Sequence, residues 1–177
     1  MVDEIADRLS TLTTDLFVVA NDAAPYASTG LRIVPDRVSD AGVLGGVYSS
    51  ILAARNEQCL VVACDMPFVS RRVVELLASE GDGCGVVICR LDDGEFEPMQ
   101  AIYGKACEAA IEASLGSGRR RVISFFGDVC VCSVSESAIR SIDPDMRSFV
   151  NINTPEEFTR YTGRSVPQIE GGRDRSR

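Results

Sequence analysis

The chain has 177 residues, of which 45% are hydrophobic, so it can build one domain with a sizeable core. Its net charge of −8 and its pI of about 4.6 argue against nucleic acid or an anionic membrane as a partner. No apolar run is long enough to cross a bilayer and the first residues do not form a signal peptide, so we expect a cytoplasmic protein.

Seven cysteines and the absence of histidine narrow the possible chemistry. The cysteines are scattered and none forms a C-x-x-C pair, so we expect reduced core residues rather than disulfides or a metal site. Without histidine, His-based catalytic triads and the commonest zinc sites are excluded. Lys105 is the only lysine, so catalysis by a lysine has one candidate.

The first half of the chain alternates between helix and strand patterns. An amphipathic helix comes first, and the strands that follow are short apolar runs. This alternation predicts an α/β fold with a mostly parallel sheet and crossover connections. We expect helices over 2–12, about 43–55 and 71–80, and strands over 16–20, 31–34 and 59–63.

The second half continues with strands and helices and ends in a polar segment. Thr154 precedes Pro155 and Glu157, which is the pattern of a helix start with a capping box. From residue 163 the chain is rich in glycine and arginine, so we expect one domain over 1–162 and a disordered tail over 163–177. We predict strands over 85–89, 99–103 and 129–134, helices over 106–115, 119–126 and 135–142, and an extended piece over 148–152.

Asp65 stands at the end of the predicted strand 59–63, two residues before Pro67. The proline prevents simple continuation of the strand, so the carboxylate should lie at the carboxyl edge of the sheet, where open α/β sheets bind ligands. A carboxylate held there suits Mg²⁺, which takes hard oxygen ligands and usually only one or two of them from protein. The alternative is that Asp65 only forms a turn or caps nearby backbone amides.

Three further sites follow strands at the same predicted edge: Asn21, Asp36 and the helix start at Gly45 and Gly46. Backbone amides at a glycine-opened helix start suit a phosphate or a purine edge, since no side chain blocks the approach. The alternatives are close helix–sheet packing for the glycines and ordinary turns for Asn21 and Asp36. Together at one edge, the four sites indicate a nucleotide cleft.

Six sequence blocks point to a family. Two of them are specific in their order and spacing: Cys-Asp-Met-Pro at 64–67 and Asn-Ile-Asn-Thr-Pro-Glu-Glu at 151–157. The others are Val-Val-Ala-Asn at 18–21, Val-Pro-Asp at 34–36, Gly-Val-Leu-Gly-Gly at 42–46 and Glu-Pro-Met-Gln-Ala at 97–101. With these blocks the chain resembles, over about residues 1–161, the molybdenum cofactor guanylyltransferases (MobA-type).

The resemblance implies a three-layer, Rossmann-like nucleotidyltransferase fold. Enzymes of this family join GTP to molybdopterin and release pyrophosphate, with Mg²⁺. Phosphoryl transfer needs positioning and charge neutralisation more than a general base, so a site without histidine is compatible with this reaction. By position, the resemblance assigns Asp65 to the metal, Asp36, Gly45 and Gly46 to the guanine and ribose, Asn21 to the nucleotide, and Asn151 and Asn153 to the pterin side of the cleft.

The chain departs from the family pattern at its start. Family members begin with a strand and a glycine-rich loop that wraps the triphosphate, with Leu-Ala-Gly-Gly at its start and an Arg and a Lys further on. This sequence starts in the helix that follows, so we expect a fold whose first, central strand is missing and whose strands 16–20 and 59–63 lack a shared neighbour. Lys105 lies too far along the chain to replace the lysine of that loop.

Two other functions remain open on this sequence. A protein of the same fold without the phosphate loop could be a non-catalytic binder of a nucleotide, a pterin, a molybdoenzyme or another cofactor-biosynthesis protein. A sister enzyme could use CTP, since the choice of base depends partly on the missing segment. The sequence across the start of the domain would discriminate between enzyme and binder.

Overall fold

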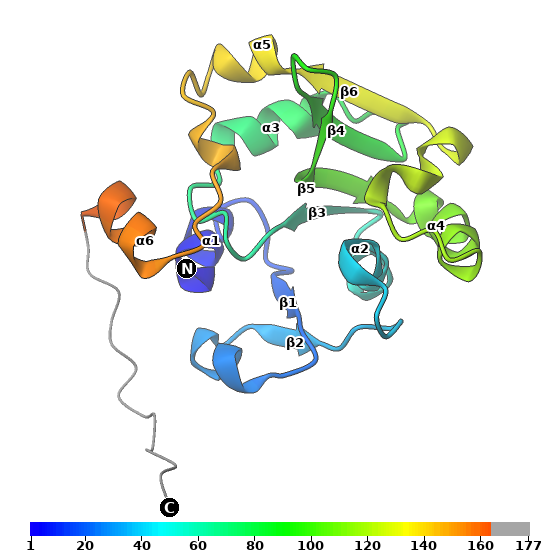
Figure 1. The fold of residues 1–177 in the computed structure, drawn as a ribbon, viewed down its shortest axis with the longest axis horizontal. Helices are drawn as coiled ribbons and strands as arrows, with labels where there is room; N and C mark the ends of the chain where they lie inside the picture. The colour runs from blue at the N-terminus through cyan, green and yellow to red at the C-terminus, as the bar shows by residue number, and fades with distance from the viewer. Residues whose placement is uncertain (164–177) are drawn as a thin grey trace, which may run out of the picture.

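The computed structural model describes residues 1–163, so all but the first residue of the expected tail lies outside the described part of the chain. Within this part, two sheets lie among helices (Figure 1). β1 (Phe17–Val19) and β2 (Arg32–Val34) pair in parallel as a two-stranded sheet. The four-stranded sheet has the order β3 (Gln58–Val62), β5 (Phe96–Gly104), β4 (Val86–Arg90) and β6 (Val131–Ser135).

The strand directions confirm the predicted α/β fold with mostly parallel strands. β4 and β6 pair in parallel, whereas β5 runs antiparallel to both of its neighbours, β3 and β4. β3, β4 and β6 therefore share one direction. β5 opposes them because a tight turn joins it to β4: the Leu91 N–H donates to the Glu95 carbonyl at 2.8 Å, and Gly94 supplies the left-handed backbone, with φ of 90°.

Helices cover both faces of the four-stranded sheet, which gives the expected three layers (Figure 1). Alternate residues of β4 enter different cores: Val86 and Ile88 face the side of α2 and α4, and Val87 and Cys89 face the side of α3 and α5. A strand buried on both faces reads as a continuous apolar run, which is what its sequence shows. The helices are α1 (Val2–Leu9), α2 (Gly42–Ala53), α3 (Arg71–Ser79), α4 (Glu108–Gly116), α5 (Glu136–Arg140) and α6 (Pro155–Thr162).

Short 3-10 turns account for the main differences from the predicted elements. They are η1 (Ala24–Thr29), η2 (Lys105–Cys107), η3 (Val122–Asp128) and η4 (Arg147–Phe149). The helix predicted over 119–126 is present as the 3-10 helix η3, which begins later, at Val122, and places Phe125 in the core. The extended piece predicted over 148–152 starts as η4 instead, because the Asp143 carboxylate accepts from the backbone N–H groups of Arg147 and Ser148.

The expectation that all cysteines are reduced is wrong for two of them. Cys84 and Cys132, which are 48 positions apart in the sequence, form a disulfide with their Cα atoms 5.9 Å apart. Cys84 precedes β4 and Cys132 lies on β6, so the parallel pairing of these two strands brings the cysteines together. No local sequence pattern reports such a pairing.

β1 and β3 are not joined, as expected for strands that lack a shared neighbour. Among residues 1–163, β1 pairs only with β2 and β3 only with β5, so each strand has one edge without backbone partners from a strand. The gap between them is bounded by α1, whose Ile5 and Leu9 pack with Val69 and Val74. Within the described residues, no helix is both long and apolar enough to cross a membrane.

The predicted capping box of α6 is present and gives a test of local stability. The Thr154 hydroxyl accepts from the Glu157 N–H at 3.1 Å, and the Glu157 carboxylate accepts from the Thr154 N–H at 3.2 Å. We expect Thr154→Ala to lower the free energy of unfolding by about 1 kcal/mol, measured by urea denaturation. Thr154→Ser keeps the hydroxyl and should restore most of this loss; equal loss in both variants would contradict the cap.

Candidate functional site

Asn21 and Asp36, which follow β1 and β2, are brought together by the parallel pairing of these strands. The Asn21 Oδ1 accepts from the Asp36 backbone N–H at 2.9 Å, and the Asn21 Nδ2 lies 3.5 Å from the Asp36 Oδ2. Asn21 thus holds the backbone at Asp36 and also contacts its half-buried carboxylate. The sequence predicted both residues at one edge, and the structure joins them directly.

α2 supplies the next part of the site through Ser49, which the sequence did not single out. The buried Ser49 hydroxyl donates to the Gly45 carbonyl at 2.8 Å and lies 3.3 Å from the Asp36 Oδ1. It also accepts from the Arg37 N–H at 2.9 Å. Ser49 therefore ties the segment after β2 to the first turns of α2. A serine inside a helical pattern carries no local signal for this contact.

The two adjacent glycines of α2, Gly45 and Gly46, have different surroundings. A Cβ added at Gly45 would lie 2.5 Å from the Ala41 Cβ, so this position is closed by packing. A Cβ added at Gly46 would meet no atom within 4 Å, so a ligand could approach the backbone there. Of the two alternatives for this helix start, packing thus applies to Gly45 and open backbone to Gly46.

Asp65 follows β3 in a turn that the structure fixes from two sides. Its carbonyl accepts from the Ile152 N–H at 2.7 Å, and the Ala63 N–H donates to the Met99 carbonyl at 3.0 Å. One oxygen of the carboxylate lacks a donor: within the described chain, the buried Asp65 Oδ1 has no hydrogen-bond partner. A buried carboxylate oxygen without a donor is costly unless a ligand supplies the missing interaction.

Glu97 on β5 adds a second carboxylate close enough to feel the charge of Asp65. Burial is the main cause that raises the pKa of Glu97. The Met99 N–H donates to the Glu97 Oε1 at 3.3 Å, and this hydrogen bond lowers the pKa. The negative charge of Asp65 raises the pKa further. In the sequence, Glu97 stands out only as part of the block at 97–101. The antiparallel direction of β5 brings Glu97 beside the end of β3, and this direction cannot be predicted from the local sequence pattern. Two oxygen-donor groups that repel each other suit a divalent cation such as Mg²⁺.

Asn151 and Asn153 flank the residue that contacts Asp65. Ile152 is buried against Phe68 and Phe158, whereas both asparagines are exposed on either side of it. The Asn153 N–H donates to the Glu157 carboxylate at 2.8 Å, so the start of α6 also fixes this segment. The backbone contact between Ile152 and Asp65 thereby places the two asparagines next to the end of β3.

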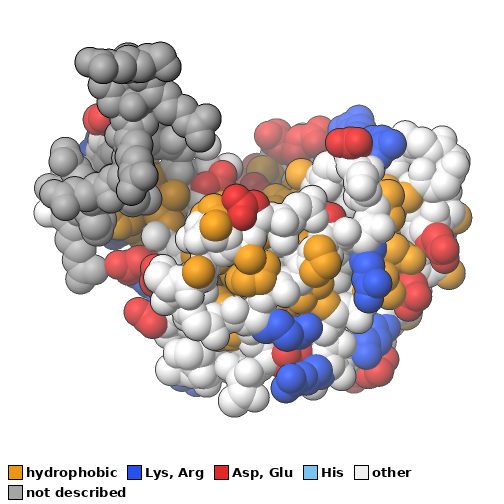
Figure 2. Space-filling view, turned by 90° about the horizontal axis from the view of Figure 1, so that it is seen from below, with side chains coloured by type: hydrophobic (Ala, Val, Ile, Leu, Met, Phe, Trp, Pro, Cys, Tyr) orange, Lys and Arg blue, Asp and Glu red, His pale blue; other side chains and the backbone are white. Residues whose placement is uncertain are grey.

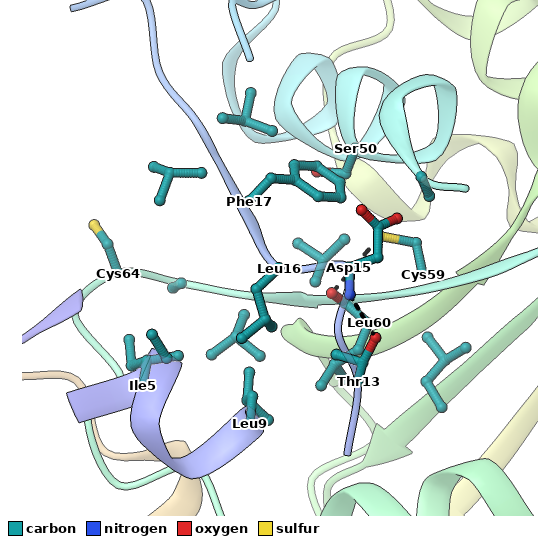
Figure 3. A pocket seen from close by; sticks show the side chains of 18 of the residues that line it. Ile5, Leu9, Thr13, Asp15, Leu16, Phe17, Ser50, Cys59, Leu60 and Cys64 are labelled. Atoms are coloured by element: carbon teal, nitrogen blue, oxygen red, sulfur yellow. Dashed lines mark hydrogen bonds between the residues drawn. The ribbon is translucent and has the colours of Figure 1, made fainter. Parts of the chain in front are cut away.

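A cavity of about 700 Å³ lies in the gap between α1, β1, α2 and β3 (Figure 3). Its wall is mainly apolar: Ile5 and Leu9 of α1, with Leu16, Phe17 and Leu60, line it. Such a wall suits an apolar chain segment better than a triphosphate. Of the predicted site residues, Gly46 and Asp65 line this cavity, whereas Asn21, Asp36, Gly45, Asn151 and Asn153 do not.

The surface on the side of β2 shows how charge is distributed around this region. In Figure 2, hydrophobic side chains are visible between polar ones, and some Lys or Arg side chains lie beside them. Among the described residues, no Lys or Arg lines the cavity. Val43, at the start of α2, is exposed to 48%.

Lys105 starts η2, where its backbone N–H donates to the Glu57 carbonyl ahead of β3. It lies at the opposite end of the sheet from Asp65, as expected, and cannot reach a phosphate there.

Comparison with known proteins places this arrangement in a family. Residues 1–129 match the model of the MobA-like NTP transferase domain. The chain is 31% identical over 159 residues to the molybdenum cofactor guanylyltransferase of Desulfosudis oleivorans, covering 89% of this chain and 78% of that protein. It is also 31% identical over 157 residues to the protein of the same name from Syntrophotalea carbinolica, covering 88% and 74%.

Solved structures agree with this assignment. The molybdopterin-guanine dinucleotide biosynthesis protein A of Archaeoglobus fulgidus has a TM-score of 0.74 at 25% identity, covering 90% of this chain and 82% of that one. The 4-diphosphocytidyl-2C-methyl-D-erythritol synthase of Anaerococcus prevotii, at 15% identity and a TM-score of 0.63, shows the shared fold alone. The matched family model, the curated relatives and the fold together show that the chain belongs to the MobA-like NTP transferase family.

Proposed function

We propose that this protein transfers GMP from GTP to molybdopterin and releases pyrophosphate, with residues 1–162 as its nucleotidyltransferase domain. The observation that carries this proposal is the buried Asp65 Oδ1 at the carboxyl end of β3, which has no hydrogen-bond partner among residues 1–163, with Glu97 beside it. The names of the relatives support the choice of substrates, since they are guanylyltransferases of the molybdenum cofactor.

Asp65 and Glu97 would hold Mg²⁺. The unsatisfied Oδ1 and the second carboxylate are oxygen donors of the kind that this ion takes from proteins. When bound, the ion supplies neutralisation of the phosphate charges at the site of substitution. The protein's own contribution is to hold the two carboxylates in place, through the pairing of β3 with β5 and the contact between Asp65 and Ile152.

Asp36 would read the guanine base. An ionised carboxylate can accept about four hydrogen bonds, so the contacts with Asn21 and Ser49 leave room for the N1–H and the N2 amino group of guanine. Gly46 leaves the start of α2 open to the nucleotide. Asn151 and Asn153, on the other side of Asp65, would contact the pterin with their exposed amides. Residues on both sides of the carboxylates would thus align the two substrates.

The first test addresses the metal. We expect Asp65→Asn and Glu97→Gln each to weaken Mg²⁺ binding in the presence of GTP at least tenfold, because each removes one carboxylate of the pair. Asp7→Asn on α1 is the matched control. Isothermal titration calorimetry gives the affinities.

The pH dependence has a defined sign. Because the pKa of Glu97 lies above its ordinary value of 4.5 and protons compete with the cation, Mg²⁺ affinity should rise with pH through that pKa, and Glu97→Gln should flatten this rise. Equal Mg²⁺ affinity in wild type and Asp65→Asn would show that Asp65 is not a ligand of the ion.

The second test addresses the base. GTP should displace a fluorescent guanine nucleotide more effectively than ATP or CTP, since adenine and cytosine do not offer the two adjacent donors that Asp36 can bind. In Asp36→Asn, the preference for GTP over ATP and CTP should fall about tenfold, because one charged hydrogen-bond pair is lost. Asp3→Asn, on the exposed face of α1, should retain it. A preference for CTP in the wild type would favour the sister enzyme instead.

The third test addresses the gap between β1 and β3. We expect the chain alone to turn over GTP weakly, because loss of one preorganised donor commonly costs on the order of a hundredfold in rate and a phosphate-binding loop supplies several. Fusing a strand and a glycine-rich loop of the family type ahead of Met1 should raise both turnover with molybdopterin and the melting temperature. Comparable activity and melting of the two proteins would show that other residues bind the triphosphate; binding of nucleotide without turnover in both would favour a non-catalytic binder.

A further inference from the structure

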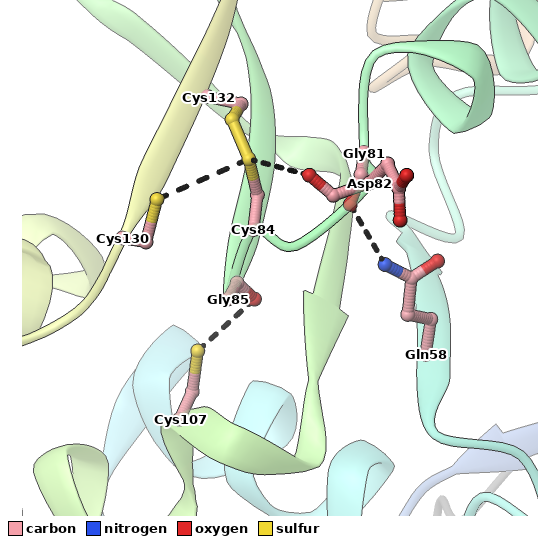
Figure 4. The surroundings of a disulfide bond; sticks show 8 residues. All are labelled: Gln58, Gly81, Asp82, Cys84, Gly85, Cys107, Cys130 and Cys132. Atoms are coloured by element: carbon pink, nitrogen blue, oxygen red, sulfur yellow. Dashed lines mark hydrogen bonds between the residues drawn. A yellow bond between two sulfur atoms is a disulfide. The ribbon is translucent and has the colours of Figure 1, made fainter.

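Three cysteines gather where β4 and β6 begin, away from the proposed nucleotide site (Figure 4). Cys130 and Cys132 are two residues apart on an extended segment, so their side chains point to the same side. Cys84 comes from the turn before β4, the strand that pairs in parallel with β6. The three Sγ atoms all lie within 4.8 Å of one another.

In the structure, two of these sulfurs are bonded and the third is close by. Cys84 and Cys132 form the disulfide, and the Sγ of Cys130 lies 4.0 Å from the Sγ of Cys84. Cys130 is exposed, so solvent and a reductant have access to the group. Cys107, in the same region, is buried and directs its thiol to the Gly85 carbonyl at 3.1 Å, so it does not join them.

We propose that reduction of the disulfide converts Cys84, Cys130 and Cys132 into a binding site for one thiophilic divalent ion of the zinc type. Three thiolates at the usual Zn–S distance of about 2.3 Å in tetrahedral geometry are about 3.8 Å apart, which is close to the 4.0 Å between the sulfurs of Cys130 and Cys84. Thiolate ligands select soft ions over Mg²⁺, so this site and the proposed Mg²⁺ site take different metals. Water fills the fourth position.

The chemistry balances with a dithiol or phosphine as the reductant. A dithiol supplies two electrons and two protons, which break the bond between Cys84 and Cys132 and leave two thiols, while the dithiol itself becomes a disulfide. A phosphine supplies the two electrons and becomes a phosphine oxide, and water then supplies the two protons and the oxygen. With Cys130, three thiols are then present. Binding of the ion releases one proton from each thiol, so the affinity rises with pH.

The site lies at the opposite edge of the sheet from Asp65. β3 and β4 run in the same direction; Asp65 follows the carboxyl end of β3, whereas Cys84 precedes the amino end of β4. The Gln58 Nε2, at the start of β3, donates to the Gly81 carbonyl near the cluster, which confirms that this is the amino-terminal edge. The ion would therefore be structural: under reducing conditions it cross-links the same two segments that the disulfide joins under oxidising ones.

Cadmium alone, added to the full-length protein under anaerobic conditions, tests this proposal. After reduction and removal of the reductant, a thiol assay in denaturant should count all seven cysteines, against five in the oxidised protein. The reduced protein should bind one equivalent of Cd²⁺ with sulfur-to-metal charge-transfer absorption in the ultraviolet and an increase in melting temperature. The oxidised protein should show neither.

Cys130→Ser is the decisive variant because Cys130 is exposed and outside the disulfide, so the fold does not depend on it. It should weaken Cd²⁺ binding at least tenfold and reduce the charge-transfer intensity by about one third, as one of three thiolates is lost. Cys59→Ser, a free thiol on β3, is the matched control and should change neither. Circular dichroism of the metal-free proteins verifies folding. Absent charge-transfer absorption in the reduced wild type, or equal binding by Cys130→Ser, would overturn the proposal.

Discussion

The register between β3 and β5 is the constraint on which the candidate site depends. Val62 pairs with Gln100, and one residue later the Ala63 N–H still reaches the Met99 carbonyl, so the two strands stay joined up to the point where Asp65 leaves the sheet. A shift by one residue would turn every side chain of β5 to the other face. Glu97 would then lose its position beside Asp65, and the carboxylate pair would not form.

The carboxylate pair is unfavourable on its own, and this has a physical meaning. Burial of Glu97 and the charge of Asp65 both oppose ionisation of Glu97, and the Asp65 Oδ1 has no donor among residues 1–163. Both effects cost stability in the free protein, and the proposed cation would relieve both. Strain of this kind accumulates at functional sites, where the surrounding structure has to hold it. Gln100, on the same strand as Glu97, is also buried with neither of its amide atoms hydrogen-bonded among the described residues.

Local patterns predicted those parts of the molecule that local physics determines. Apolar runs gave the strands, and the capping pattern at Thr154 gave the start of α6. Asn21, Asp36 and Asp65 could be selected as candidates because each follows a strand, and the carboxyl ends of such strands meet at one edge. Glu97, Ser49 and the disulfide were not predictable in this way. Each depends on contacts between segments far apart in the chain, and a residue type alone does not report its partner.

The two adjacent glycines of α2 make this helix dependent on the rest of the fold. Glycine inside a helix costs roughly 1 kcal/mol relative to alanine, so these two, in a 12-residue helix that also begins with Gly42, leave α2 with little helical preference of its own. Its stability comes instead from Leu44, Val47 and Ile51, which are fully buried in the core. The open backbone at Gly46 and the anchoring of Asp36 by Ser49 therefore exist only while the core is intact. Folding of the sheet and formation of the proposed nucleotide contacts thus become one cooperative event.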